Sequence, residues 1–149
     1  MLKLSTKCRY AVRALVELGV AYGGEPVSLR EIGERQEISK RYLEHLVRPL
    51  QAAGFVESAR GAEGGYTLVR DPASITMRHI IEVFEGPIAF VDCVDDADRC
   101  RRANVCPVRD VWREMSRGTA MVLEGHTLAE LVACEKRARK AGHAKKNKA

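Results

Sequence analysis

The hydrophobic pattern of the N-terminal half changes its period once, and this change restricts the fold more than any other feature of the sequence. Three segments with apolar residues at three- and four-residue intervals come first, beginning near Tyr10, Ser28 and Ser39. Two short segments that favour strands follow, Phe55–Ala59 and Tyr66–Val69, and a turn with three glycines separates them. The pattern predicts three helices followed by one β-hairpin.

Local signals predict where these helices begin and end. Ser28 and Glu31 have the spacing of a capping box, in which hydroxyl and carboxylate each accept a hydrogen bond from a free amide. Ser39 has the side chain of an N-cap for the third helix, and Gly54 is suited to end that helix. Pro49 removes one backbone hydrogen bond, so we expect the last turns of this helix to kink or tighten.

After the hairpin, the sequence predicts a unit made of a helix, a cysteine-containing loop and a long helix, and then a basic tail. A helix is expected over residues 76–85, a loop over 88–105, and a long helix from about Pro107. The apolar residues of the long helix form a stripe suited to pairing with another helix. The predicted fold is mainly α with a small β-hairpin: a winged helix-turn-helix domain at residues 1–72 and a unit with the long helix at 73–135. Residues 136–149 are expected to be a disordered basic tail.

Composition and charge exclude several classes of protein. Of the 149 residues, 46% are hydrophobic and 30% are charged, which suits a soluble globular chain. No apolar stretch approaches the ~20 residues of a membrane helix and no secretory signal opens the chain, so we expect a cytoplasmic protein with no membrane partner. The sequence lacks a P-loop, a dinucleotide-binding glycine pattern and a nucleophile elbow, so we expect no enzyme.

Basic residues gather at the two ends of the chain. The net charge is +5, with an excess of Lys and Arg in residues 1–70 and in the last 14 residues, whereas residues 71–135 are acidic. This distribution indicates a polyanion partner. For the basic tail taken alone, the simpler interpretation is that it is solvated and disordered and binds no partner.

Three helices followed by a hairpin are typical of a DNA-binding winged helix-turn-helix, in which the third helix enters the major groove by its amino end. Arginine beside glycine at a hairpin tip suits a narrow minor groove. The residues that we predict to contact double-stranded DNA are Ser39, Lys40, Arg41, Tyr42, Glu44, His45, Arg60, Gly61 and Gly64. The alternative interpretation is that the charged residues at the start of the third helix contact only solvent.

Five cysteines are an odd number for a chain without an export signal, so a disulfide framework is not expected. Cys93, Cys100 and Cys106 lie together between two predicted helices, and Cys106 precedes a proline, as ligands of iron–sulfur clusters often do. These three residues therefore predict a metal or cluster site, with reactive or inert thiols as alternatives. Cys8 and Cys134 lie on apolar helical faces, and Cys134 is expected to be a small buried residue.

The sequence resembles the Rrf-type (redox response factor) family of bacterial winged-helix transcription regulators, and its IscR- and NsrR-like members in particular. The resemblance covers about residues 2–135. It rests on the opening segment Leu4–Leu15, the segment Ile38–Glu44, the sequence RGAEGGY at Arg60–Tyr66 and the three spaced cysteines. It implies a homodimer on a palindromic operator, with the helix from Pro107 as the dimerisation helix. It also implies one 2Fe–2S or 4Fe–4S cluster per subunit, bound by Cys93, Cys100 and Cys106, and the function of a repressor.

One position departs from the family pattern. IscR-like members have a histidine three residues after the third cysteine, and Arg109 stands there in this chain. The fourth ligand is therefore open, and Cys8 of the partner subunit is one hypothesis. Two other functions remain as alternatives: a cluster-free regulator that senses oxidants through its thiols, and a small metalloprotein for electron transfer.

Overall fold

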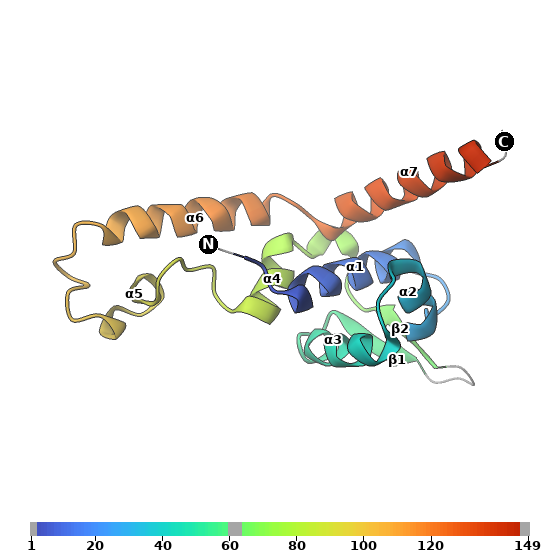
Figure 1. Ribbon diagram of the computed structural model, residues 1–149, viewed down its shortest axis with the longest axis horizontal. Helices are drawn as coiled ribbons and strands as arrows, with labels where there is room; N and C mark the ends of the chain where they lie inside the picture. Colours follow the sequence, from blue (N-terminus) through green and yellow to red (C-terminus); the bar gives the residue numbers. More distant parts are fainter. Residues whose placement is uncertain (1–2, 60–63, 147–149) are drawn as a thin grey trace.

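The computed structural model describes residues 3–59 and 64–146 (Figure 1). The chain is mainly helical with one antiparallel two-stranded hairpin, as the sequence predicts. The elements in chain order are α1 (Thr6–Val20), α2 (Leu29–Gln36), α3 (Lys40–Ala52), β1 (Val56–Ala59), β2 (Gly65–Leu68), α4 (Met77–Glu85), α5 (Asp92–Asp95), α6 (Arg109–Glu124) and α7 (Leu128–Lys146). Short 3-10 turns at Pro72–Ser74 and Ala97–Arg99 complete the described elements.

Side-chain caps define the starts of α2 and α3. The Ser28 hydroxyl accepts a hydrogen bond from the Glu31 amide at 3.2 Å, and the Glu31 carboxylate accepts one from the Ser28 amide at 3.0 Å. The Ser39 hydroxyl accepts one from the Tyr42 amide at 3.3 Å. Both predicted caps are confirmed, because each depends only on residues three positions apart.

A tight turn joins α2 to α3. A Cβ atom on Gly33 would lie 2.6 Å from the Ile38 carbonyl oxygen, so this position admits only glycine without a shift of the backbone. Glu37 ends α2 in the left-handed conformation, with φ of 53°. The two helices are thereby fixed at close range, as a helix-turn-helix requires.

The hairpin is attached to the strand-like segment before α2. Val27 and Tyr66 exchange two backbone hydrogen bonds of 3.0 and 2.9 Å. A Cβ atom on Gly65 would approach the side chain of Pro26 to 2.9 Å, so the backbones meet closely here. The hairpin therefore lies beside the start of α2 as well as beside the end of α3.

One hydrophobic cluster joins the helices of the N-terminal half to α4 and to the start of α7. Its members with no solvent exposure are Ala11, Leu15, Ile32, Leu43, Leu50, Ile75, Ile80 and Leu128. Among the described residues, none from 85 to 127 belongs to this cluster. The segment that holds the three cysteines is therefore built outside the main core.

The cysteine loop, residues 88–106, has more regular structure than the sequence predicts. It contains the single helical turn α5 and the 3-10 turn Ala97–Arg99. These elements were not expected, because four-residue turns leave no periodic pattern in the sequence. Figure 1 shows that α5 and the first half of α6 extend away from α1–α3.

The chain beyond residue 135 also differs from the expected disordered tail, because α7 continues to Lys146. Alanine, lysine and arginine favour helix, and Glu135 pairs with Arg139 one turn later at 2.8 Å. None of the helices in the described part of the chain is long and apolar enough to span a membrane.

Glu17 joins three helices through a buried carboxylate. Its side chain has no solvent exposure, and it accepts hydrogen bonds from Gln36 at 2.6 Å, from Arg35 at 3.4 Å, and from Arg139. Burial by itself would raise the pKa of Glu17, but the hydrogen bonds from Arg139, Gln36 and Arg35 outweigh it and hold the pKa below its usual range. The last helix is therefore connected through α1 to α2.

Candidate DNA-binding surface and cysteine loop

The residues predicted on the third helix fall on two sides of α3. Lys40 and Glu44 line a groove between α3 and the hairpin. Tyr42 and His45 line a second groove, formed with α1 and α4, and the Tyr42 ring packs edge-on against Tyr10 with centroids 5.7 Å apart. The structure thus brings the predicted residues to one end of α3 but separates them into two sets.

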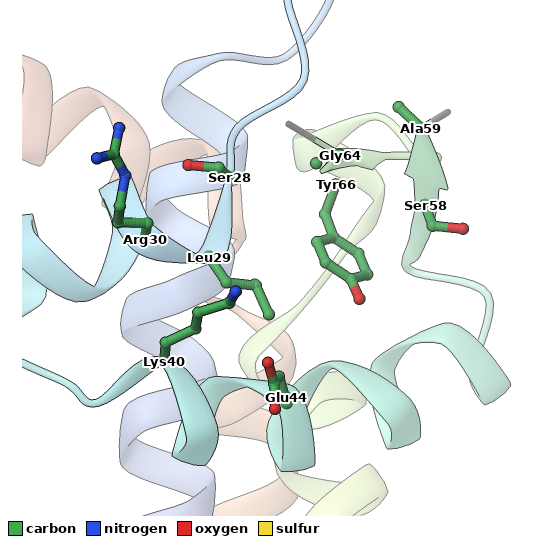
Figure 2. Close-up of a pocket in the computed structure, with 10 residues that line it drawn as sticks. Ser28, Leu29, Arg30, Lys40, Glu44, Ser58, Ala59, Gly64 and Tyr66 are labelled. Atoms are coloured by element: carbon green, nitrogen blue, oxygen red, sulfur yellow. The ribbon is translucent and has the colours of Figure 1, made fainter. Parts of the chain in front are cut away.

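The groove beside the hairpin has a volume of about 450 Å³. Figure 2 shows Lys40 and Glu44 rising from α3 toward Tyr66 of β2, with Ser58 on the neighbouring strand. Gly64 also lines this groove, and its φ of 59° is favoured by glycine. The groove therefore combines two basic side chains, Arg30 and Lys40, with one acidic side chain and several hydroxyl groups on an open surface.

Three residues on this side of the molecule were not predicted from the sequence as DNA contacts: half-buried Ser28 and exposed Arg30 and Arg48. Ser28 and Arg30 at the start of α2 line the groove, and Arg48 is exposed one turn beyond Glu44 on α3. The capping box had indicated the start of α2, but no local signal connects it with the hairpin. The position of Ser28 and Arg30 beside the hairpin follows from the backbone pairing between Val27 and Tyr66 of β2.

Two predicted contacts, Arg60 and Gly61, lie outside the described residues. The strands on either side of them are described, and β1 pairs with β2 in the register Val56 to Leu68 through Ala59 to Gly65. The predicted hairpin is thus confirmed, whereas the role of its tip stays a prediction.

The three cysteines of the loop occupy different local structures. Cys93 lies in α5, Cys100 follows the 3-10 turn, and Cys106 precedes α6, and all three are partly exposed. Thiolates are suitable ligands for iron–sulfur clusters. However, among the side chains that the structure describes, in residues 3–59 and 64–141, no three of Cys, His, Asp or Glu are grouped closely enough to hold a metal ion. The three thiols are therefore chemically suitable ligands for a cluster, but they do not lie close enough together to hold one in this conformation.

Arg109, which stands where the resemblance implied a histidine, binds the backbone of this loop. Its Nε donates a hydrogen bond to the Cys93 carbonyl oxygen at 2.8 Å, and Nη1 donates one to the Ala103 carbonyl oxygen at 3.2 Å. An arginine keeps its proton in proteins and offers no lone pair to a metal. The Arg109 side chain therefore stabilises the backbone of the loop and does not serve as a metal ligand.

The two remaining cysteines differ from expectation. Cys8 is completely buried in α1, and burial, with the nearby carboxylate of Glu85, raises the pKa of its thiol to about 11. In this conformation it cannot be the ligand of a partner's metal, as the hypothesis for the fourth ligand required. Cys134 is exposed in α7, where Arg137 contacts its sulfur, so the expectation of a buried residue was wrong.

The sequence model of the Rrf2 family, described as iron-dependent transcriptional regulators, matches residues 4–134. The chain belongs to the Rrf2 family. It is 41% identical over 130 residues to the HTH-type transcriptional regulator CymR of Bacillus subtilis, which covers 87% of this chain and 89% of that protein.

Two solved structures of Rrf2-type regulators are similar to this fold. The structure of CymR, the global cysteine regulator of B. subtilis, has a TM-score of 0.74 at 41% identity and covers 89% of this chain and 98% of CymR. The IscR of T. potens has a TM-score of 0.73 at 38% identity, over 92% and 90% of the two chains. The Rrf2 chain is a DNA-binding transcription regulator with a winged-helix fold, and it is not an enzyme.

Proposed function

We propose that this regulator is a cytoplasmic, homodimeric repressor that binds a palindromic operator and senses redox state, iron–sulfur status or nitric oxide through Cys93, Cys100 and Cys106. The observation that carries the DNA-binding part is the groove between the start of α3 and the hairpin, with Lys40 and Arg30 at its edges. A regulator of transcription acts in the compartment that holds the chromosome, which is why we include the cytoplasm.

The exposed residues of α3 have distinct tasks in this proposal. Lys40 and Arg41 are exposed at the amino end of α3 and meet phosphates or guanine. Glu44 accepts from cytosine or disfavours other bases. Arg60 contacts the minor groove from the hairpin tip. Contacts of the basic residues with phosphates would supply affinity, and contacts of Glu44, Lys40 or Arg41 with base edges would supply selection.

An apolar stripe on α6 supports the homodimer. Val108, Val111, Met115 and Val122 are between 41% and 63% exposed, and they follow one another at intervals of three, four and seven residues. Such spacing is typical of helices that pair with a copy of themselves. Gly118 continues the stripe and has no atom within 4 Å of a Cβ built there, so a second helix could approach closely. We therefore assign this face to a second copy of the chain.

The cysteine loop is the proposed sensor. When bound, a 2Fe–2S or 4Fe–4S cluster, one per subunit, would supply a centre that oxidants and nitric oxide attack. Cys93, Cys100 and Cys106 would hold it as thiolates, and the loop must rearrange to bring them together because they are not grouped here. Its direct connection to α6 gives a path from the loop to the dimer face.

One observation favours a second candidate, a cluster-free regulator that senses oxidants through its thiols. Three partly exposed cysteines lie on one loop without a preformed metal group among the described residues. CymR, which is 41% identical to this chain, is named as the global cysteine regulator of B. subtilis. Thiol sensors need accessible cysteines of this kind. Membership of a regulator family argues against the electron-transfer alternative.

The sensor is tested on full-length protein purified without oxygen. Iron and acid-labile sulfide in equal amounts, with charge-transfer absorption bands, would support the cluster. A colourless, iron-free protein that forms disulfides with a mild oxidant, from a host able to build clusters, would replace it with the thiol mechanism. A sedimentation measurement of mass in the same samples tests the dimer.

DNA binding is tested by selecting genomic fragments with the same protein and titrating one of them at several salt concentrations. Lys40→Ala should weaken binding several-fold and reduce the slope of log affinity against log salt by about one. Arg117→Ala is the matched control, because it removes one exposed arginine from α6, far from α3. Equal salt slopes for the two variants would remove Lys40 from the phosphate-binding surface.

A further inference from the structure

The cysteine loop is attached to α6 mainly through one side chain at the start of that helix. The two carbonyl groups bound by Arg109, those of Cys93 and Ala103, lie ten residues apart on either side of Cys100. Arg109 is itself three residues after Cys106. A single guanidinium therefore connects both limbs of the loop to the first turn of α6.

The chemistry of this contact requires arginine. A guanidinium has donors on separate nitrogen atoms held in one plane, so it can bind two carbonyl groups at once in a fixed geometry. Hydrogen bonds from a charged donor are stronger than those between neutral groups. A lysine at the same position has the charge but would bind the two carbonyls less well, because its donors share one nitrogen.

A second contact attaches the beginning of the loop to the same helix. The buried hydroxyl of Ser116 accepts a hydrogen bond from the Phe90 amide at 3.1 Å and donates one to the Trp112 carbonyl at 2.8 Å. Between these contacts the loop has two single turns, and Ala103 is its one buried hydrophobic residue among those described. Hydrogen bonds to α6, more than apolar packing, therefore hold the shape in which the cysteines are apart.

We propose that Arg109 is a positioning residue that fastens the cysteine loop in a shape in which the three thiols are apart, and that its release is the step that frees Cys93, Cys100 and Cys106 to react or to converge. The inference deepens the proposed function, because it rests on these three cysteines being the sensor. It also explains how the loop acts on the dimer face: Arg109 begins α6, so any rearrangement that withdraws the Cys93 or Ala103 carbonyl changes the contacts of the first turn of that helix.

The test measures the alkylation rate of each cysteine in full-length, reduced protein kept free of metal by a chelator. Short pulses of iodoacetamide are followed by digestion and mass spectrometry, which quantifies every cysteine separately. In Arg109→Ala we expect Cys93, Cys100 and Cys106 to react about five to ten times faster than in the natural sequence. Arg109→Lys should give an intermediate increase, and Arg117→Ala, which removes an exposed charge elsewhere on α6, should give none.

Two cysteines of the same chain provide internal controls. Cys8 is completely buried, so it reports global unfolding, and exposed Cys134 reports the reactivity of the reagent. A release limited to the loop leaves both rates unchanged. If Cys8 also reacts faster in Arg109→Ala, that variant has lost its fold, and Arg109→Lys then decides: its loop cysteines must react at least twice as fast while Cys8 stays slow.

The proposal would be overturned if the loop cysteines of folded Arg109→Ala were alkylated within twofold of their rates in the natural sequence. If Arg109→Ala does not fold, equal alkylation rates in Arg109→Lys and the natural sequence would overturn it instead. The outcome is separate from that of the proposed function. Protein that assembles no cluster, forms no thiol switch and selects no DNA would end the proposed function, whereas the alkylation pattern would still show that Arg109 fastens the loop.

Discussion

The helices that carry the DNA-binding groove and the loop that carries the cysteines are stabilised in different ways. The first region has a continuous hydrophobic core, and every helix in it contributes residues with little or no exposure. The cysteine loop has one buried hydrophobic residue among those described. It depends on two hydrogen bonds that Arg109 donates to its carbonyl groups and on one that Ser116 accepts from its Phe90 amide. The helices around the core are therefore held rigidly, and the cysteine loop can change shape at a low cost in free energy.

The largest expected effect tests the hydrophobic core around α1–α3. Leu43→Ala removes a completely buried side chain from α3 and should lower the free energy of unfolding by about 2–5 kcal/mol. Chemical denaturation measures the change. A loss below about 1 kcal/mol would mean that α3 is held by something other than its packing against α1 and α2.

The next effect concerns the apolar stripe on α6. Met115→Glu puts a charge at the centre of the proposed dimer face, and by symmetry each interface receives two such charges. We expect the Kd of the dimer to rise by roughly 100-fold, about 2.7 kcal/mol. Met121→Glu, at a more exposed residue off the stripe, is the control, and an equal loss of dimer in both variants would place the interface elsewhere.

A smaller effect concerns the buried ionic contact between α1, α2 and α7. Glu17→Gln keeps the shape but loses the charge that Arg139 and Arg35 face, so stability at neutral pH should fall by about 1–3 kcal/mol. The two arginines are partly exposed, which limits the effect.

The pH dependence of that difference follows from the lowered pKa of Glu17. A carboxyl whose pKa is lower in the folded state contributes its full stability above the pKa of the unfolded chain, and this contribution disappears as pH falls through the folded pKa. Unfolding curves of the natural sequence and Glu17→Gln should therefore converge below about pH 4. A constant difference from pH 7 to pH 3 would contradict the charged contact.

The smallest effect is expected in the cysteine loop. Val105 is 73% exposed, so Val105→Ser should change the free energy of unfolding by less than about 0.5 kcal/mol. A loss comparable to that of Leu43→Ala would show that the loop has a core of its own in solution, and the comparison between the two regions would fail.

The same difference explains what could be predicted from the sequence. The caps at Ser28 and Ser39 and the hairpin were found because their signals lie within a few residues. The contacts of Glu17 with Arg139 and of Arg109 with Cys93 span 122 and 16 residues, and nothing local indicates them. The exposure of Cys134 was missed for the same reason, since it depends on which face of α7 meets α1.

The position of α7 has a consequence for how the protein is made. Leu128 and Val132 complete the core around α1, and Arg139 meets Glu17, so the core around α1–α3 needs residues from the far end of the chain. During synthesis, the first 127 residues emerge before these partners exist. A ribosome-bound or prematurely ended chain would carry the recognition helix without its full support. The N-terminal helices therefore acquire their full core only late in synthesis, so we expect chains that end before α7 to bind DNA poorly.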